Sequence, residues 1–279
     1  MKYAISFHRG FRHFDKIDEI IFKYTDKNTN LLDAFEGREN WQRFIIDVTE
    51  RTIIEEDLVM FNLLRKKYKF AIKLSIVQRE LAADLYEENI PFFFEEFADT
   101  WDKLASMVGL GVSDVYIVAD LGFDLKDVSA FCKQNKVKVR VFPNIAQVSS
   151  KVDNLDSFHH FFIRPEDVEI YSEYIDVLEF FGDLDRQSVL YEIYTKGKWV
   201  GKLNELILNF KSPIDNQTIP PIFAEKRLDC GKKCLKGKCK ICTRIKNISS
   251  VLQENNLVIR KAKDNENTIN VSDTETITE

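Results

Sequence analysis

The feature that most constrains the fold of this chain is a repeated alternation of short apolar runs with amphipathic stretches. Eight runs have the length and composition of β-strands that are covered on both faces. They are residues 2–7, 44–48, 70–76, 90–95, 115–120, 137–142, 159–164 and 177–182. Eight strands, each followed by a helix, predict an α/β fold of the (β/α)8 or TIM-like barrel type. An open doubly wound sheet is the alternative, because the sequence alone does not show closure.

Helical periodicity fills the intervals between these runs. An Asp is a good N-cap, so Asp124 marks one helix start and Asp183 or Asp185 marks another. Pro165, followed by two acidic residues, is a further start signal. The helices are expected at 15–24, 55–68, 79–88, 100–108, 125–134, after 165 and from about 186.

Composition fits one large domain with a small appendage. The chain has 279 residues, 44% of them hydrophobic, and a net charge of −5, which gives no global indication of nucleic-acid binding. No apolar run approaches the ~18 residues of a membrane helix. The N-terminal segment returns to charge by Arg9, unlike a signal peptide. We therefore expect no membrane association and a cytoplasmic, reducing environment.

Four of the five cysteines lie close together near the C-terminus, with the spacing C-x3-C-x4-C-x2-C: Cys230, Cys234, Cys239 and Cys242. In a reducing compartment, clustered thiols indicate metal ligands rather than disulfides. An iron–sulfur cluster (4Fe-4S), a structural zinc site and metal-free thiols all stay open as interpretations. The fifth cysteine, Cys132, falls on a predicted helix and is expected in the core.

The segment 226–246 around these cysteines is strongly basic. It holds nine Lys or Arg residues against the single acid Asp229, a local net charge of +8. This charge would stabilise bound thiolates, or it would bind RNA or another anionic substrate or a protein partner. A solvated loop is the third interpretation. Residues 224–258 contain no aromatic side chain, so base stacking by this segment is not expected.

The chain therefore divides into four predicted parts. A barrel over 1–210 is followed by an extended connector over 211–229. A cysteine-rich basic module over 230–258 includes a short helix at 244–258. The polar, acidic segment 259–279 is expected to be disordered.

The chemistry of such barrels lies at the C-terminal ends of the strands. Asp47 and Glu95 are candidate general acids or bases there, and Arg164 is a candidate ligand for an anion. The phosphate-binding and dinucleotide motifs are missing, which disfavours nucleotide hydrolysis and hydride transfer. The full polar ring predicted at the strand ends is His8, Arg9, Asp47, Ser75, Glu95, Glu96, Asp120, Asn144, Arg164, Glu179 and Asp183.

Two stretches resemble the U32 peptidase-like family. One is residues 159–207, in which IRPED at 163–167 is followed by a helix and a strand ending at Gly182, and the other is LGVSDVYIVAD at 110–120. The resemblance implies an iron–sulfur TIM-barrel protein that hydroxylates RNA or a small aromatic substrate. It carries over to Arg164, Pro165, Glu166 and Gly182 as motif positions and to the four cysteines as ligands.

Two departures from the family pattern put hydroxylation in question. The cysteines are more tightly spaced than in the hydroxylase members, and Asp183 stands where those proteins have an Arg. Two other functions stay open. One is a non-enzymatic binding or accessory protein with a structural zinc site, and the other is a peptidase-like hydrolase that uses the mouth carboxylates.

Overall fold

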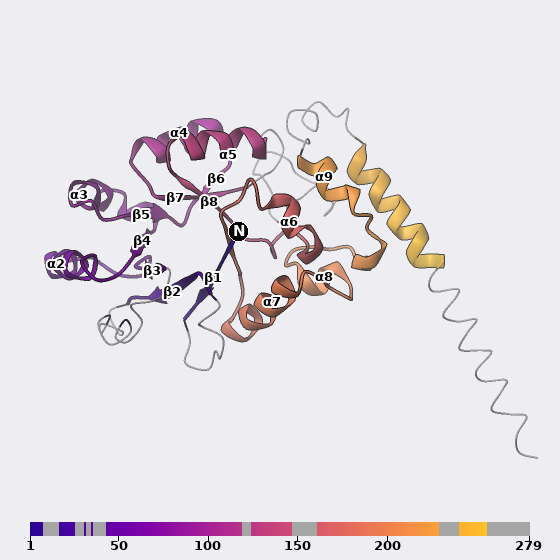
Figure 1. Ribbon diagram of the computed structural model, residues 1–279, viewed down its shortest axis with the longest axis horizontal. Coiled ribbons are helices and arrows are strands. Elements are labelled where there is room, and N and C mark those ends of the chain that lie inside the picture. The colour runs from indigo at the N-terminus through magenta and orange to yellow at the C-terminus, as the bar shows by residue number, and fades with distance from the viewer. Residues whose placement is uncertain are drawn as a thin grey trace, which may run out of the picture.

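A computed structural model describes residues 1–7, 17–25, 31, 35, 43–118, 124–146, 161–228 and 240–255. These residues form an α/β fold around one parallel sheet (Figure 1). Its order is β5-β4-β3-β2-β1-β9-β8-β7-β6. The strands are β1 (Lys2–Ser6), β2 (Glu19–Lys23), β3 (Arg43–Asp47), β4 (Phe70–Leu74), β5 (Phe92–Phe94), β6 (Phe97–Ala98), β7 (Asp114–Ile117), β8 (Lys138–Val141) and β9 (Val177–Glu179).

The sheet is a nearly closed barrel, because its two outer strands are consecutive in the chain. Only Glu95 and Glu96 separate β5, which pairs with β4, from β6, which pairs with β7. The Ser113 amide also donates a hydrogen bond of 2.7 Å to the Phe92 carbonyl, which connects β5 to the start of β7. Counted as one interrupted strand, β5 and β6 give the barrel eight positions, as predicted.

The sheet has nine strands where eight were predicted, and two of the predicted assignments are wrong. Residues 15–24 were expected to form a helix, but Glu19–Lys23 is the second barrel strand. Both faces of this strand are covered, so Glu19 to Phe22 are all buried and no alternation marks it as a strand. The helix-like spacing of Ile17, Ile20 and Ile21 is therefore a coincidence of an apolar strand.

The strand predicted at 159–164 is not part of the barrel. Strand β8 pairs directly with β9, and of the described residues 161–164 in the predicted run, only Phe161 has a bridge. The run is apolar because Phe162 packs against Phe210 and Phe223, with ring centroids 5.1 and 6.0 Å apart. His159 and His160 lie outside the described residues.

Helices cover the outside of the barrel (Figure 1). The helices predicted at 55–68, 79–88, 100–108 and 125–134 are confirmed with small changes in their ends. The predicted N-caps at Asp124 and Asp183 are also confirmed, because their carboxylates accept from the amides of Lys126 and Arg186. The α-helices are α2 (Glu55–Leu64), α3 (Leu81–Glu87), α4 (Trp101–Gly109), α5 (Leu125–Gln134), α6 (Val168–Tyr171), α7 (Leu184–Lys196), α8 (Leu203–Leu206) and α9 (Ile222–Leu228).

Short 3-10 helices complete the framework: η2 (Ile76–Gln78), η4 (Pro165–Asp167) and η5 (Asn216–Thr218). The start predicted at Pro165 is thus the first residue of η4. The connector over 211–229 is not extended throughout, since it contains both η5 and α9.

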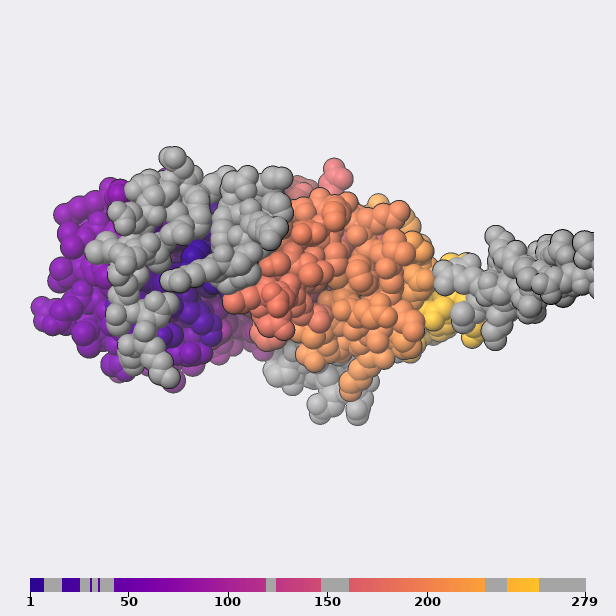
Figure 2. Space-filling view, turned by 90° about the horizontal axis from the view of Figure 1, so that it is seen from below, coloured from indigo at the N-terminus to yellow at the C-terminus, as the bar shows by residue number. Residues whose placement is uncertain are grey.

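A further helix spans 241–255, close to the one predicted at 244–258. It packs against the segment before α9, because Ser249 donates to the Thr218 carbonyl and the Gln253 amide donates to the Pro213 carbonyl. Figure 2 shows this helix (yellow) beyond residues 161–228 (orange), at the opposite side of the molecule from the purple residues, which follow about residue 50 in the chain. No helix in the described ranges is long and apolar enough to cross a bilayer.

Candidate active site

The barrel interior contains charged side chains at its N-terminal end. Glu19, Arg43 and Asp114 are the first residues of β2, β3 and β7, and strand register places Glu19 beside Arg43. The Arg43 guanidinium donates to Glu19 at 3.1 Å and to both oxygens of Asp114 at 2.8 and 2.7 Å. Arg140 of β8 donates to Glu19 at 2.5 Å and to Asp114 at 3.1 Å. We call these four residues the basal network.

The ion pairs of the basal network determine the charge of its acids. Burial raises the pKa of Asp114, but Arg43 and Arg140 outweigh this effect and hold that pKa well below its ordinary value. Burial likewise raises the pKa of Glu19, and Arg140 with Arg43 lowers it by more. Both carboxylates are therefore ionised at neutral pH and paired with permanent cations.

Arg140 connects the basal network to the other end of the barrel. Its second terminal nitrogen donates to Glu179 Oε2 at 2.9 Å. The Tyr116 hydroxyl donates to the same oxygen at 2.6 Å. Burial raises the pKa of Tyr116 well above its ordinary value, so its hydroxyl stays protonated and acts as a donor. Glu179 is thereby fixed, and its other oxygen is left to face the C-terminal end of the barrel.

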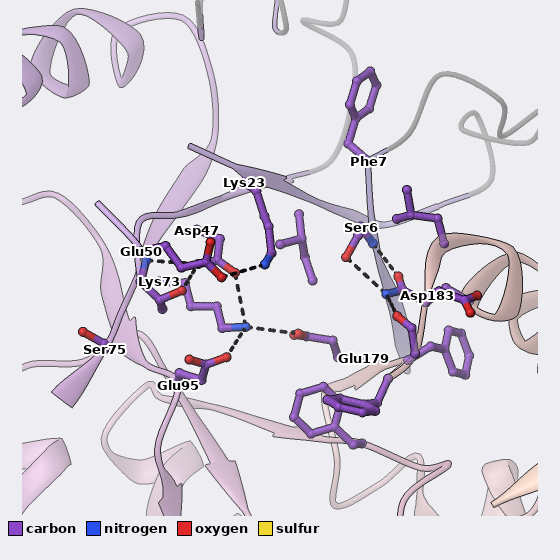
Figure 3. A pocket seen from close by; sticks show the side chains of 18 residues that line it. Ser6, Phe7, Lys23, Asp47, Glu50, Lys73, Ser75, Glu95, Glu179 and Asp183 are labelled. Carbon is purple, nitrogen blue, oxygen red and sulfur yellow. Dashed lines mark hydrogen bonds and ion pairs between the residues drawn. The ribbon is translucent and has the colours of Figure 1, made fainter. Parts of the chain in front are cut away.

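At this end, an ammonium group lies among three carboxylates (Figure 3). The Nζ atom of Lys73 is 3.5 Å from Asp47 Oδ2, 3.4 Å from Glu95 Oε1 and 3.6 Å from Glu179 Oε1. Asp47 ends β3, Lys73 is its register partner in β4, Glu95 follows β5 and Glu179 ends β9. We call these four residues the mouth cluster.

The members of the mouth cluster differ in exposure. The side chains of Lys73, Asp47 and Glu179 are only 5–6% exposed, whereas that of Glu95 is 55% exposed. Asp47 is also held by the amide and the hydroxyl of Thr49 at 3.1 and 2.7 Å. Burial would lower the pKa of Lys73, but Glu179 and the other carboxylates raise it well above 10.5. Lys73 is therefore a permanent cation in this arrangement, and Glu95 is the member that solvent and ligands can reach.

The mouth cluster forms part of the lining of a cavity of about 740 Å³. This volume lies within the range of small-molecule sites. Its charged lining residues are Lys23, Asp47, Glu50, Lys73, Glu95, Glu179 and Asp183. Its apolar lining residues include Phe142, Phe180, Phe181 and Leu184.

The structure brings together two of the three predicted catalytic residues. Asp47 and Glu95 both line the cavity and face the same ammonium group. Of the wider predicted ring, Ser75, Glu179 and Asp183 also line it. His8, Arg9 and Asp120 lie outside the described residues, whereas Glu96 pairs with Lys103 and Asn144 binds the backbone of Phe181.

Arg164 does not reach the cavity. Its guanidinium donates to both oxygens of Asp167 at 2.6 and 2.7 Å and to the carbonyl of Ile219 at 3.1 Å. It is buried and joins η4 to the segment that follows η5. Arg164 was expected at the barrel mouth. This prediction is wrong because the run before Arg164 is not a barrel strand, so the end of that run does not lie at the mouth.

Sequence reasoning missed Lys73, the centre of the mouth cluster. The available signal was a single charged residue inside the apolar run FAIKLSI. A charge in a strand that is covered on both faces must point into the barrel and needs a partner there.

The described part of the cysteine run is Cys242, on the first turn of the helix over 241–255, where it is buried. Cys230, Cys234 and Cys239 lie outside the described residues, as does the tail over 259–279. Among the residues that the structure describes, no group of three or more His, Cys, Asp or Glu side chains is arranged to hold a metal ion. Cys132 is in the core, as expected, and burial raises the pKa of its thiol to about 12.

No protein-family model matches the sequence, and no curated protein matches it significantly.

Proposed function

We propose that this protein is a barrel enzyme that binds a small molecule in the mouth cavity and transfers a proton to or from it, with Glu95 as the proton-transfer group. The observation that supports this function is the mouth cluster. It places one accessible carboxylate beside a buried ammonium group and two buried carboxylates, at the end of a barrel where such folds carry their chemistry.

The distances in the mouth cluster are longer than those of a structural ion pair and are more typical of a ligand-binding site. Charge-assisted N–H···O bonds are usually about 2.7–2.9 Å long. Lys73 instead lies 3.4–3.6 Å from its three partners and is shared among them. Glu95 can therefore turn toward a ligand without leaving Lys73 unpaired, because Asp47 and Glu179 stay in place.

Each residue has a distinct role in this proposal. Glu95 accepts a proton from the substrate, the electron pair of the broken bond stays on the substrate, and the proton later returns to the substrate or product. Lys73 offsets the repulsion among the carboxylates. Asp47 and Glu179, fixed by Thr49 and by Arg140 with Tyr116, hold Lys73 in position. A positioned acid–base group contributes about 10²–10⁴-fold to a rate.

The neighbouring residue offers a matched control. Glu95→Gln removes the proton-transfer group, whereas Glu96→Gln changes an adjacent carboxylate that does not line the cavity. Wild-type protein is incubated with a cell extract, and the compounds that it converts are identified by mass spectrometry. We expect Glu95→Gln to slow the conversion by about 10²–10⁴-fold and Glu96→Gln to leave it within twofold. Conversion at the wild-type rate by Glu95→Gln, or no conversion by the wild-type protein, would overturn the proposal.

The cysteine run supports a second proposal, a metal centre next to the barrel. Four thiols are suitable ligands for a 4Fe-4S cluster or for zinc. The favouring observation is that Cys242 is buried on a helix that Ser249 joins to η5 through the Thr218 carbonyl, so one end of the run is anchored. The centre would be held by Cys230, Cys234, Cys239 and Cys242, in a cytoplasmic, reducing compartment.

The metal proposal has a direct test. Oxygen-free purification followed by iron, zinc and sulfide analysis, with an absorption spectrum, distinguishes a cluster from zinc. Cys239→Ser is expected to remove at least half of the bound metal, and Cys132→Ser, at a buried core position, is expected to retain it. Metal-free wild-type protein contradicts both forms of the proposal.

The resemblance to the U32 peptidase-like family adds a more specific version, in which a cluster serves hydroxylation of RNA or a small aromatic substrate. The basic segment supports contact with RNA, and its described residues Lys240 and Arg244 are exposed. Reversing both charges should then weaken RNA binding and reduce its salt dependence. Unchanged RNA binding would favour the non-enzymatic alternative, in which zinc stabilises a module that binds a protein partner.

A further inference from the structure

Among the described residues, the charges inside the barrel do not balance. The basal network and the mouth cluster form one connected chain through Arg140 and Glu179. In the part of the chain that the structure describes, its five carboxylates face four cations, including Lys138 at 3.4 Å from Glu19. The carboxylates are Glu19, Asp47, Glu95, Asp114 and Glu179, and the cations are Arg43, Lys73, Lys138 and Arg140.

The unmatched negative charge lies at the mouth. In the basal network, two arginines pair with two carboxylates at 2.5–3.1 Å. At the mouth, one ammonium group is shared by three carboxylates. A narrow cleft with low-dielectric walls focuses such a potential and attracts the opposite charge. One more positive charge near Glu95 would complete the network.

The lining residues outside this chain do not supply that charge. Lys23 is paired with Glu50 at 3.2 Å on the cavity rim. Asp183 adds a further carboxylate, which caps α7 by accepting from the Arg186 amide. The described lining of the cavity is therefore negative overall, which disfavours an anionic occupant.

The aromatic lining residues of the cavity indicate the second part of the ligand. Phe142 stacks on Tyr116 with centroids 5.1 Å apart, and Phe181 meets Phe142 edge-on at 5.9 Å. Phe181 is 50% exposed, although it follows a buried strand. Rings fixed in this way offer a flat apolar surface and can also attract a cation by their π faces.

From this combination we infer that the mouth cavity binds an organic amine whose ammonium group lies against Glu95 and whose flat apolar group lies against Phe181 and Phe142. This inference names the substrate class of the proposed function and rests on it.

Calorimetric titration with matched probes tests the charge preference. The probes are 2-phenylethylamine, 3-phenylpropionate, which replaces the amine by a carboxylate, and potassium chloride alone. We expect the amine to bind at least tenfold more tightly than the carboxylate. Equal or tighter binding of 3-phenylpropionate, competition by potassium ions at equal concentration, or no measurable binding of the amine at millimolar concentration would overturn the inference.

Variants test the two contacts separately. Glu95→Gln should weaken amine binding by about tenfold to hundredfold, as the loss of a hydrogen bond to a charged group does. Phe181→Ala should weaken it by roughly threefold to tenfold. Glu96→Gln should change it by less than twofold. Wild-type amine affinity in both Glu95→Gln and Phe181→Ala contradicts the proposed contacts.

The experiments distinguish failure of the amine-binding inference from failure of the proposed enzymatic function. If the amine binds through Glu95 but is not converted, and no extract compound is converted, the inference stands and the enzymatic proposal fails. If the protein converts a neutral or anionic compound through Glu95, the enzymatic proposal stands and the amine inference fails.

Discussion

The two ends of the barrel interior use the same residue types in different ways. In the basal network, all four side chains are at least nine-tenths buried and the donor–acceptor distances are 2.5–3.1 Å. In the mouth cluster the distances are 3.4–3.6 Å, and Glu95 is half exposed. Buried ion pairs are tolerated only when the geometry is good and every charge has a partner. The basal network meets this condition, whereas the mouth cluster meets it only in part.

This difference separates a structural role from a functional one. A network with matched charges leaves no charge for a ligand to balance and fixes the strands that it joins. A cluster with more carboxylates than cations lowers the stability of the fold through charge repulsion. Such local losses of stability are typical of functional sites, where a bound ligand supplies the missing charge. The comparison therefore predicts that substitutions at the N-terminal end change folding and that those at the mouth change mainly function.

The largest effect is expected from Arg140→Met. This change leaves Glu19, Asp114 and Glu179 without their shared cation in the barrel interior. Removing one partner from a buried ion pair costs about 3–5 kcal/mol. Urea unfolding followed by circular dichroism measures the loss. Lys138→Met is the control, because Lys138 is 35% exposed and should cost at most about 1 kcal/mol. Equal losses in the two variants would remove the distinction between the buried network and its edge.

Acid should act mainly on the basal network. The folded protein lowers the pKa of Asp114 below 3.8 and that of Glu19 below 4.5, so both contribute stability above those values. This stability is lost as the pH falls from about 4.5 through the lower, folded pKa values. A single strongly lowered carboxyl contributes on the order of 2–3 kcal/mol. Unfolding measured from pH 7 down to pH 2 should show this decline, and in Arg140→Met the decline should be smaller.

At the mouth, the pH dependence has the opposite sign. The pKa of Lys73 is raised above 10.5 in the folded protein. Its stabilising contribution is therefore complete below pH 10.5 and is lost as the pH rises further. Lys73→Met should cost about 1–3 kcal/mol at neutral pH, less than Arg140→Met, because Glu95 can turn into solvent and the buried Asp47 and Glu179 keep their other hydrogen bonds. The same unfolding measurements test this order, and a loss larger than that of Arg140→Met would reverse the comparison.

More residues of the mouth cluster than of the basal network could be predicted from the sequence. Asp47, Glu95 and Glu179 follow apolar runs, so the barrel pattern alone placed them at strand ends. Arg43, Asp114 and Arg140 lie at the start of strands or inside them, where a charged side chain ordinarily indicates a strand edge or a loop. Their mutual pairing joins strands more than 70 positions apart, such as β3 and β7, and no local pattern records it.

Local sequence patterns also could not show that the barrel closes. Seven of the eight predicted runs coincide with barrel strands, the strand at 19–23 was taken as a helix, and the buried run at 159–164 was taken as a strand. Both segments are apolar for tertiary reasons: the first is covered on both faces, and Phe162 of the second packs against α9. The position of Arg164 depended on the second assignment, which explains why that candidate does not lie at the mouth.

The smallest effect on folding is expected from Glu95→Gln, although the same change should have the largest effect on the proposed activity. Removing one of three carboxylates around Lys73 relieves repulsion, and the Gln side chain can stay in solvent. Stability should therefore be unchanged or increased by up to about 0.5 kcal/mol. Glu96→Gln removes a partly exposed 2.7 Å pair with Lys103 and should cost about 0.2–1 kcal/mol. A loss above about 1 kcal/mol in Glu95→Gln would show that the mouth cluster, like the basal network, is a structural element, because a carboxylate kept for a ligand is not needed by the fold.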